Sequence, residues 1–306
     1  MSFPLLDRRE ADFDRRGFRL GDAASTEHLT IIGRTFVEGY NAAWMLRAPA
    51  LQARVGGVDP ELRGFAHEGA AMALMLGDVL LPWRRSRWMH FTDGPAKPHI
   101  YLAFVGAGWA FARLGRIRPR FDALDPLLRW LIFDGCGFHD AYFRPRDTVS
   151  LQRRSRRSHR AAEIYDQGVG RALWFVECAN PDAIADTIET FALARRANLW
   201  SGVGLAATYA GGMDGAALRR LRHRASGFEP HLAQGSAFAA KARDRAATVD
   251  AECELAVQIL CGCTSSDAAR ATDLAAAQVE DRGRDDAYES WRDATRRLLG
   301  ERRVVA

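Results

Sequence analysis

The sequence predicts an all-α fold, and three observations support this prediction. Apolar residues recur at helical spacing along most of the chain. Helix-start signals, in which a capping side chain precedes a proline, occur at Asp125-Pro126 and at Asn180-Pro181. Segments that alternate apolar and polar residues, as half-buried strands do, are nearly absent.

Several helices can be placed from their start signals. Ser25 and Thr26 can cap a helix that runs to about Leu46, before Pro49. Asp125-Pro126 opens the segment LLRWLIFDGCGFHDAYF, and Asn180-Pro181 opens DAIADTIETFALARR as one helix. The last third of the chain has the pattern of amphipathic helices rich in alanine.

Three pairs of segments indicate an internal duplication. FVEGYNAA, from Phe36, resembles GFHDAYF; AHEGAAMALML, from Ala66, resembles YDQGVGRALWF; VGAGWAFARLG, from Val105, resembles SGVGLAATYAGG. AQGSAFAAKA, from Ala233, is a weaker further copy of the middle element. The order is preserved at a spacing of about 100 residues, which predicts a duplicated helical unit whose halves face one another across an apolar cavity.

The duplication divides the chain into four parts. These are an N-terminal segment (1–25), a first repeat (26–124), a second repeat (125–215) and C-terminal helices (216–306) that pack on the same domain. GVGLAA, at 202–207, matches a Gly-x-Gly-x-x-Ala pattern but lacks the preceding apolar strand of a dinucleotide fold. We therefore attribute its glycines to close helix packing and expect no dinucleotide site.

Composition excludes several classes of protein. The chain is 48% hydrophobic and 26% charged, as globular proteins are, and its longest apolar stretches fall short of the roughly 20 residues that span a bilayer. No signal peptide is visible, so we expect a cytoplasmic protein with five reduced cysteines. The basic run at 153–160 has no interleaved aromatic residues, which favours a solvated loop over nucleic-acid binding; a site for a phosphorylated substrate tail is the alternative.

Ionisable residues interrupt the apolar stripes of these helices. Glu68 lies on one face with Ala71, Met72 and Met75, and Asp166 with Val169 and Leu173. His139 continues a stripe that leads to Tyr142, whereas Glu38 lies on a second face of its helix. Because a buried unpaired carboxylate costs several kcal/mol, each acid needs a partner, a proton or a metal.

Three interpretations of these residues remain open. Glu68, His139, Asp166 and Arg171 could form a polar cluster that only ties the halves together. Glu68, His139 and Asp166 could instead ligate iron or manganese, as acids and histidines do inside helical bundles, although the usual Glu-x-x-His spacing is missing. In the third interpretation, His139 transfers protons to and from an apolar ligand with help from a nearby acid.

The chain also resembles a known family. HEGAAMAL, HIYLAFVGAGWAFARL, DPLLRWLIFDGCGFHDAYF, YDQGVGRALWFVECANPDAIA, NLWSGVGLAATYAGG and PHLAQGSAFAAKAR are similar to segments of a domain-of-unknown-function family found in enediyne biosynthesis clusters of actinobacteria. The resemblance covers about residues 30–295. It implies a role in antibiotic biosynthesis, a branch of secondary metabolism, at the steps that convert a linear conjugated polyene by dehydrogenation or rearrangement.

The residues and the resemblance together predict a specific site. Its catalytic residues would be His139, as the proton-transfer group, with Glu68 and Asp166 to orient it. Its ligand-binding residues would be Arg171, Tyr142, Gln167, Trp109 and Glu38. The ligand would be a hydrophobic polyene, handled alone or with other proteins of the pathway. A non-catalytic protein that binds the polyene and passes it to a partner enzyme is the rival prediction, and the oligomeric state stays open.

Overall fold

The computed structural model describes residues 5–81, 86–115, 124–154 and 158–305, and these residues form an all-α fold with no strand, as predicted. The described residues also include two 3₁₀ turns, η1 (Arg8–Ala11) and η4 (Leu128–Trp130), and one π-helical turn, η5 (Arg146–Ser150). The helices are α1 (Phe13–Arg16), α2 (Ala23–Met45), α3 (Ala48–Gly56), α4 (Pro60–Leu80), α5 (Arg87–Asp93), α6 (Ile100–Leu114), α7 (Leu131–Phe143), α8 (His159–Val176), α9 (Pro181–Glu189), α10 (Leu193–Tyr209), α11 (Gly215–Arg224), α12 (Glu229–Arg245), α13 (Ala251–Cys261), α14 (Ser265–Ala277) and α15 (Ala287–Val305).

The predicted helix starts are partly right. Asn180 caps α9 as expected, accepting from two main-chain N–H groups, but that helix ends at Glu189 and a new helix, α10, begins at Leu193. Asp125 also accepts two main-chain N–H groups, although a 3₁₀ turn precedes α7. The cap of α2 is Asp22 and not Ser25 or Thr26, because the Asp22 carboxylate already accepts from the Ser25 N–H at 2.8 Å.

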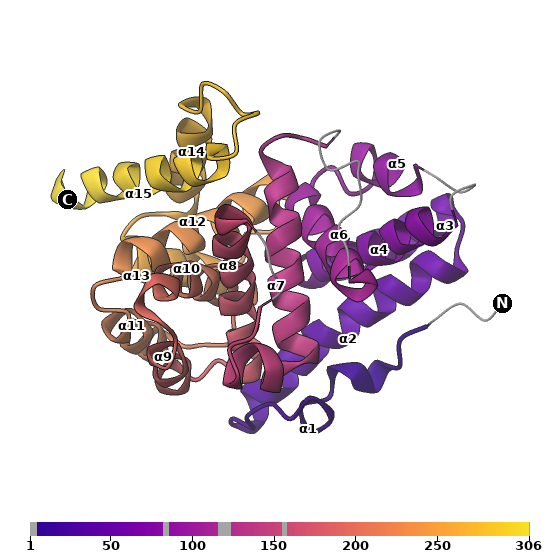
Figure 1. Cartoon of the computed structure of the whole chain (residues 1–306), viewed down its shortest axis with the longest axis horizontal. Helices are drawn as coiled ribbons and strands as arrows, with labels where there is room; N and C mark the ends of the chain where they lie inside the picture. The colour runs from indigo at the N-terminus through magenta and orange to yellow at the C-terminus, as the bar shows by residue number, and fades with distance from the viewer. Residues whose placement is uncertain (1–4, 82–85, 116–123, 155–157, 306) are drawn as a thin grey trace.

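The long helices form a serial array in which each packs on the one before it and the one after it. The order of packing is α2, α4, α6, α7, α8, α10, α12 and α14. Figure 1 shows this as a steady change of colour from α2 and α4 on one side to α12 and α13 on the other. The Nε2 atom of His28 in α2 also lies 2.6 Å from the Ala210 carbonyl oxygen at the end of α10, so the first long helix contacts a later helix of the array.

Neighbouring helices cross at glycines, where their backbones come too close for a side chain. A Cβ added at Gly135 of α7 would lie 2.1 Å from the Val105 carbonyl oxygen of α6, and one at Gly137 would lie 1.9 Å from the Tyr165 carbonyl oxygen of α8. Gly-x-Gly pairs make the same two-sided contact in three more helices: Gly106 and Gly108 in α6, Gly168 and Gly170 in α8, Gly202 and Gly204 in α10. Close packing therefore explains the glycines of GVGLAA.

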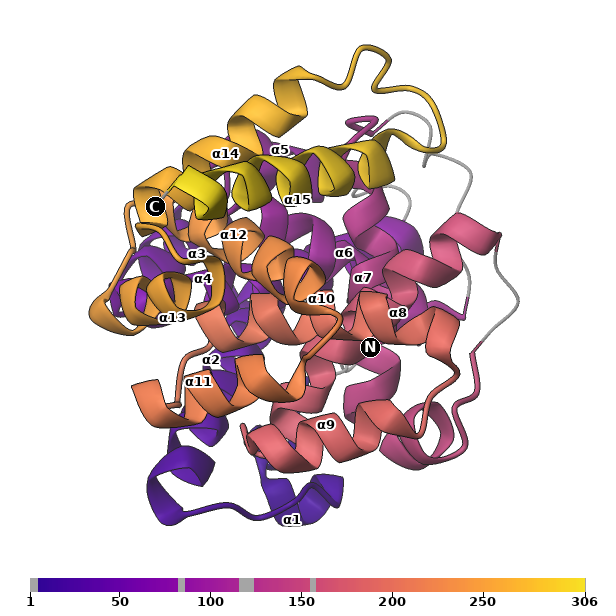
Figure 2. The same cartoon turned by 90° about the vertical axis from the view of Figure 1, so that its left-hand side faces the viewer.

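Among the described helices α2, α4 and α12 make such a contact on one side only, through Gly39, Gly69 and Gly235. The contact thus repeats from helix to helix between α2 and α12, and the duplication of a unit of about 100 residues stays a prediction. The predicted domain boundaries are untested, and packing continues across them, for example between α10 and α12. At the far end of the array α14 and α15 pack on α12, and Figure 2 shows α15 lying across that end of the molecule.

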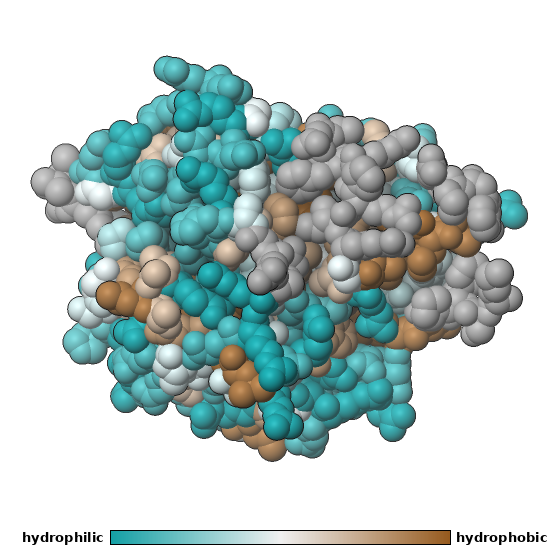
Figure 3. Space-filling view, in the orientation of Figure 1, coloured by the Kyte–Doolittle hydropathy of each residue, from teal (hydrophilic) through white to brown (hydrophobic). Residues whose placement is uncertain are grey.

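The outside of the array is largely polar. On the face seen in Figure 3 hydrophilic residues predominate, and the apolar ones lie among them or beside atoms drawn in grey. In the described part of the chain no helix is both long and apolar enough to cross a bilayer. The five cysteines are thiols, as predicted, and four of them are buried. Of the basic run at 153–160, residues 155–157 lie outside the described residues.

Candidate functional site

An apolar pocket lies inside the array, surrounded by α2, α4, α6, α7, α8 and α10. Its aromatic lining consists of Phe36, Phe65, Trp109, Phe138, Tyr142, Phe143, Phe175 and Tyr209. Leu6 and Glu10, from the N-terminal segment, contribute to one side. The free volume is about 40 Å³, enough for a few water molecules, so a larger ligand requires lining side chains to turn aside.

Glu68 of α4 is the unusual group in this pocket. It is 1% exposed, and its Oε1 has no hydrogen-bond partner among the described residues. The nearest cation is Arg171, whose Nη2 lies 4.0 Å from that oxygen. Burial raises the pKa of Glu68 to about 7; the Arg171 charge opposes this rise, and the Asp134 carboxylate adds to it. Glu68 can therefore gain and lose a proton near neutral pH.

Asp134 of α7 is the principal partner of Arg171, and the sequence prediction missed it. The Arg171 guanidinium makes a close ion pair with Asp134 Oδ1, and both side chains are buried. Gln167, one residue before Gly168, donates to Asp134 Oδ2 at 2.8 Å. Arg171 therefore divides its charge between Asp134 and Glu68, and it lowers the pKa of Glu68 without offsetting the rise that burial causes.

These residues belong to a row with a common sequence signal. In five of the helices a buried polar residue directly precedes a glycine at which two helices cross. We call this set the polar row; its members are Glu68 of α4, Asp134 of α7, Gln167 of α8, Ser201 of α10 and Gln234 of α12. The Ser201 hydroxyl lies 3.4 Å from Gln167 Oε1 and 2.9 Å from Gln234 Oε1, and donates to one of them. A polar residue followed by glycine, which recurs in these five long helices although not in α6, is the signal that could have found Asp134.

Comparison with known proteins identifies the chain at the level of a family. The family described as "Protein of unknown function (DUF1702)" matches residues 4–299, which is nearly the whole chain. The chain belongs to the DUF1702 family. No curated protein and no solved structure matches it, so the arrangement of its own residues has to carry the functional argument.

Asp166 of this DUF1702 chain lies apart from the pocket, although it is as buried as Glu68. Arg195 donates to both of its oxygens, at 2.9 and 2.6 Å, and Arg154 donates at 3.1 Å. Within the described residues no contact joins Asp166 to Glu68 or His139. Asp166 and Gln167 are adjacent in α8, so they point about 100° apart, and it is Gln167 that enters the polar row.

His139 lies one layer behind the pocket. Its ring contacts Trp109 and Phe143, with centroids 5.7 and 4.8 Å apart, and both of those residues line the pocket. Its Nδ1 lies 3.2 Å from Asp140, while Nε2 has no hydrogen-bond partner in the described part of the chain. Burial lowers the pKa of His139, so the imidazole is held neutral.

The predicted ligand-binding residues separate into two groups. Arg171, Tyr142 and Trp109 line the pocket, and Trp109 packs on Phe36 with ring centroids 4.5 Å apart. Gln167 lies behind Arg171 in the polar row. Glu38 is at the surface, where Arg8 and Arg54 pair with it at 3.1 Å each.

The structure does not bring the predicted iron or manganese ligands together. In the described ranges no three His, Cys, Asp or Glu side chains are grouped as a metal site requires. Glu68, His139 and Asp166 each face different neighbours: Arg171, Asp140 and Arg195. This donor arrangement does not fit a carboxylate-bridged centre.

Proposed function

We propose that the protein binds an elongated, apolar, conjugated molecule in this pocket and rearranges its double bonds by proton transfer at Glu68. The enediyne-type linear polyene implied by the family resemblance is the ligand we propose, and secondary metabolism in the cytoplasm is the setting. One observation carries the proposal: a carboxyl group that titrates near pH 7 and has an oxygen without a hydrogen bond borders an apolar, aromatic pocket.

The proposed step is balanced without a change of oxidation state. The Glu68 carboxylate takes a proton from a carbon next to the conjugated system, so one C–H bond breaks and its electron pair delocalises along the chain. Protonated Glu68 exchanges its proton with water in the pocket and then gives a proton to a carbon further along, where a new C–H bond forms and the double bonds have shifted. A group with a pKa near the working pH suits both halves of this exchange.

This proposal moves the proton-transfer role from His139 to Glu68. His139 lies behind Trp109 and Phe143, whereas Glu68 borders the pocket directly. Arg171 borders the same pocket, and its charge would stabilise negative charge that develops on the ligand. Dehydrogenation, the other reaction that the resemblance implies, needs an electron acceptor in addition to these residues.

The aromatic lining favours one rival, a non-catalytic polyene-binding protein. Flat aromatic side chains stack on a conjugated chain whether or not Glu68 reacts with it. Such a protein would shield the polyene and pass it to a partner enzyme of the pathway.

An exchange experiment separates the two functions. Wild-type protein, Glu68→Gln and Glu38→Gln are incubated in D₂O with a conjugated tetraene fatty acid as probe. Probe fluorescence reports binding, and mass spectrometry reports deuterium uptake at carbon. We expect uptake with wild type and with Glu38→Gln, whose changed side chain is at the surface, and a loss of at least about a hundredfold with Glu68→Gln.

Each outcome decides between the proposals. Tight binding without deuterium uptake by the wild type contradicts catalysis and supports the binding protein. Uptake that is undiminished in Glu68→Gln removes Glu68 from the reaction. Absence of binding by a folded wild type overturns both functions for this class of ligand.

A further inference from the structure

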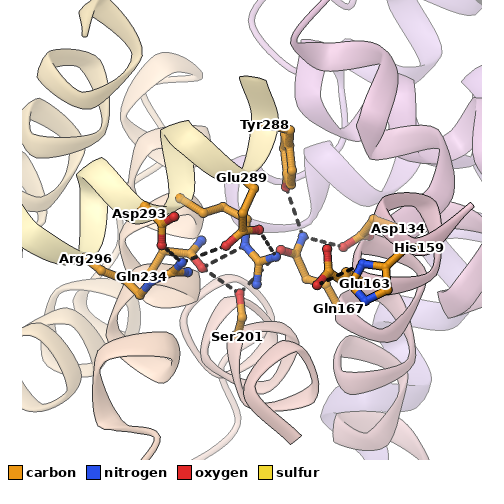
Figure 4. A network of polar contacts seen from close by, with 11 residues as sticks. Asp134, His159, Glu163, Gln167, Ser201, Gln234, Tyr288, Glu289, Asp293 and Arg296 are labelled. Atoms are coloured by element: carbon orange, nitrogen blue, oxygen red, sulfur yellow. Dashed lines mark hydrogen bonds and ion pairs between the residues drawn. The ribbon is translucent and has the colours of Figure 1, made fainter. Parts of the chain in front are cut away.

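The polar row connects the pocket to the C-terminal helix, α15. The Gln167 side-chain amide donates to Asp134 Oδ2 at 2.8 Å and to the Tyr288 hydroxyl of α15 at 3.1 Å. Figure 4 shows Tyr288 descending from α15 toward Gln167, with Asp134 on the other side of the amide. All three side chains are buried, so no bulk solvent can replace a lost hydrogen bond.

A second residue of α15 contacts the polar row. Arg292 is fully buried, and its Nε donates to Gln234 Oε1 at 3.2 Å, while its Nη1 contacts Glu289 at 2.8 Å. The Ser201 hydroxyl lies between the two glutamines and donates to one of their amide oxygens, Gln234 Oε1 at 2.9 Å or Gln167 Oε1 at 3.4 Å. Tyr288 is therefore the α15 residue that bonds Gln167 directly, whereas Arg292 holds Gln234, beside the Ser201 hydroxyl that lies between the two glutamines.

Gln167 in turn controls how Asp134 and Arg171 are held. Asp134 divides its two oxygens between Arg171 and the Gln167 amide. If the amide is lost, the whole carboxylate charge falls on Arg171 and draws the guanidinium further from Glu68. The position of Arg171 beside Glu68 thus depends on the hydrogen bond between the Gln167 amide and the Tyr288 hydroxyl of α15.

We propose that Tyr288 and Gln167 are positioning residues for the acid–base site, and that docking of α15 completes that site. This rests on the proposed function of Glu68. Neither residue borders the pocket that contains Glu68, so both act through Asp134 and Arg171. The C-terminal helix is then a working part of the site although it lies at the far end of the array.

The charged and titratable groups that face Glu68 come from three helices. Asp134 is on α7, Arg171 on α8, and the Tyr209 phenol, whose own pKa burial raises to about 12, is on α10. α2 contributes Phe36 to the pocket, and α6 contributes Trp109, whose indole lowers the pKa of Glu68 slightly. Of these groups, Asp134 is the one whose hydrogen bonding depends on α15, through Gln167.

The test titrates Glu68 directly in Tyr288→Phe, which keeps the ring packed on Phe238 and Trp291. Infrared difference spectra follow the carboxyl stretch with pH, and the Glu68→Gln spectrum identifies the band of Glu68. Without the Tyr288 hydroxyl the Gln167 amide loses the acceptor that orients it, and its hydrogen bond to Asp134 weakens. We expect the pKa of Glu68 to rise by roughly one unit, a tenfold change in proton affinity, because Arg171 is then drawn toward Asp134.

Tyr165→Phe is the matched control. It removes another buried tyrosine hydroxyl, which donates to Asp140 at 2.9 Å outside the polar row, and the titration of Glu68 should stay unchanged. Gln167→Met, which keeps the side-chain length and cannot donate, provides a second variant, and the shift should have the same sign as in Tyr288→Phe.

An unchanged Glu68 titration in a folded Tyr288→Phe, or an equal shift in Tyr165→Phe, would overturn the inference. If Tyr288→Phe does not fold, Gln167→Met decides in the same way. The titration requires no ligand, so it tests the inference separately from the proposed function. An unchanged titration can occur while deuterium uptake still depends on Glu68, and a shifted titration can occur without any deuterium uptake.

Discussion

Glu68 and Asp166 are equally buried carboxylates in opposite surroundings. Each is 1% exposed, yet two arginines place three hydrogen bonds on Asp166, whereas one oxygen of Glu68 has no such partner within the described residues. Asp166 anchors α8 to the segments that carry Arg154 and Arg195. The comparison teaches that burial alone does not make an acid a candidate for chemistry, and that a missing partner beside an apolar pocket is what distinguishes Glu68 from Asp166.

The largest difference between the two acids is expected in how their substitution changes the free energy of unfolding. Asp166→Asn should lower the free energy of unfolding by about 3 kcal/mol or more, because it leaves Arg195, which is mostly buried, without its counter-charge. Glu68→Gln should cost little at pH 7 or stabilise the fold, since it removes an acid that burial already disfavours. Urea unfolding of both variants beside the wild type measures this, and equal losses would remove the distinction.

The pH dependence of the unfolding free energy tests whether the pKa of Glu68 is raised. The pKa of this acid is raised from 4.5 to about 7 in the folded protein, so the folded state holds a proton that the unfolded state has released. The wild type should therefore lose about 3 kcal/mol relative to Glu68→Gln as the pH rises from 4.5 through 7, at 1.36 kcal/mol for each unit of pKa shift. Unfolding free energies of the two proteins should diverge between pH 4.5 and about 7 and stay parallel above that range. A constant difference between them would show that Glu68 has an ordinary pKa.

Much of the fold could be predicted from the sequence. Helical periodicity gave the fold class, and the Asn180-Pro181 signal gave the start of α9. The break between α9 and α10 was missed, because TFALA continues the helical pattern without a proline or glycine to end it. The glycine pairs suggested a copy of one segment in another, and in the structure their contacts recur between successive long helices from α2 to α12.

The candidate site was less predictable, for a physical reason. In α8 every residue from Tyr165 to Val176 is buried, so no exposed face fixes which side of the helix meets the pocket. Periodicity therefore could not tell Asp166 from Gln167, nor show that Asp134, and not Asp166, lies near Glu68. Glu68 and Arg171 were identified because an acid or a base in a wholly apolar run needs an explanation wherever the run packs.

The smallest expected effect concerns His139, another buried group with an atom that lacks a hydrogen bond among the described residues. Burial lowers its pKa below 6.5, so on acidification the unfolded chain takes up a proton that the folded chain refuses. The wild type should lose stability relative to His139→Gln as the pH falls below 6.5, by at most about 1.4 kcal/mol for each pH unit. This slope is opposite to that of Glu68, so one set of urea curves between acid and neutral pH tests both. If the wild type instead gained stability relative to His139→Gln as the pH falls, His139 would be charged and paired with Asp140, which contradicts a neutral imidazole.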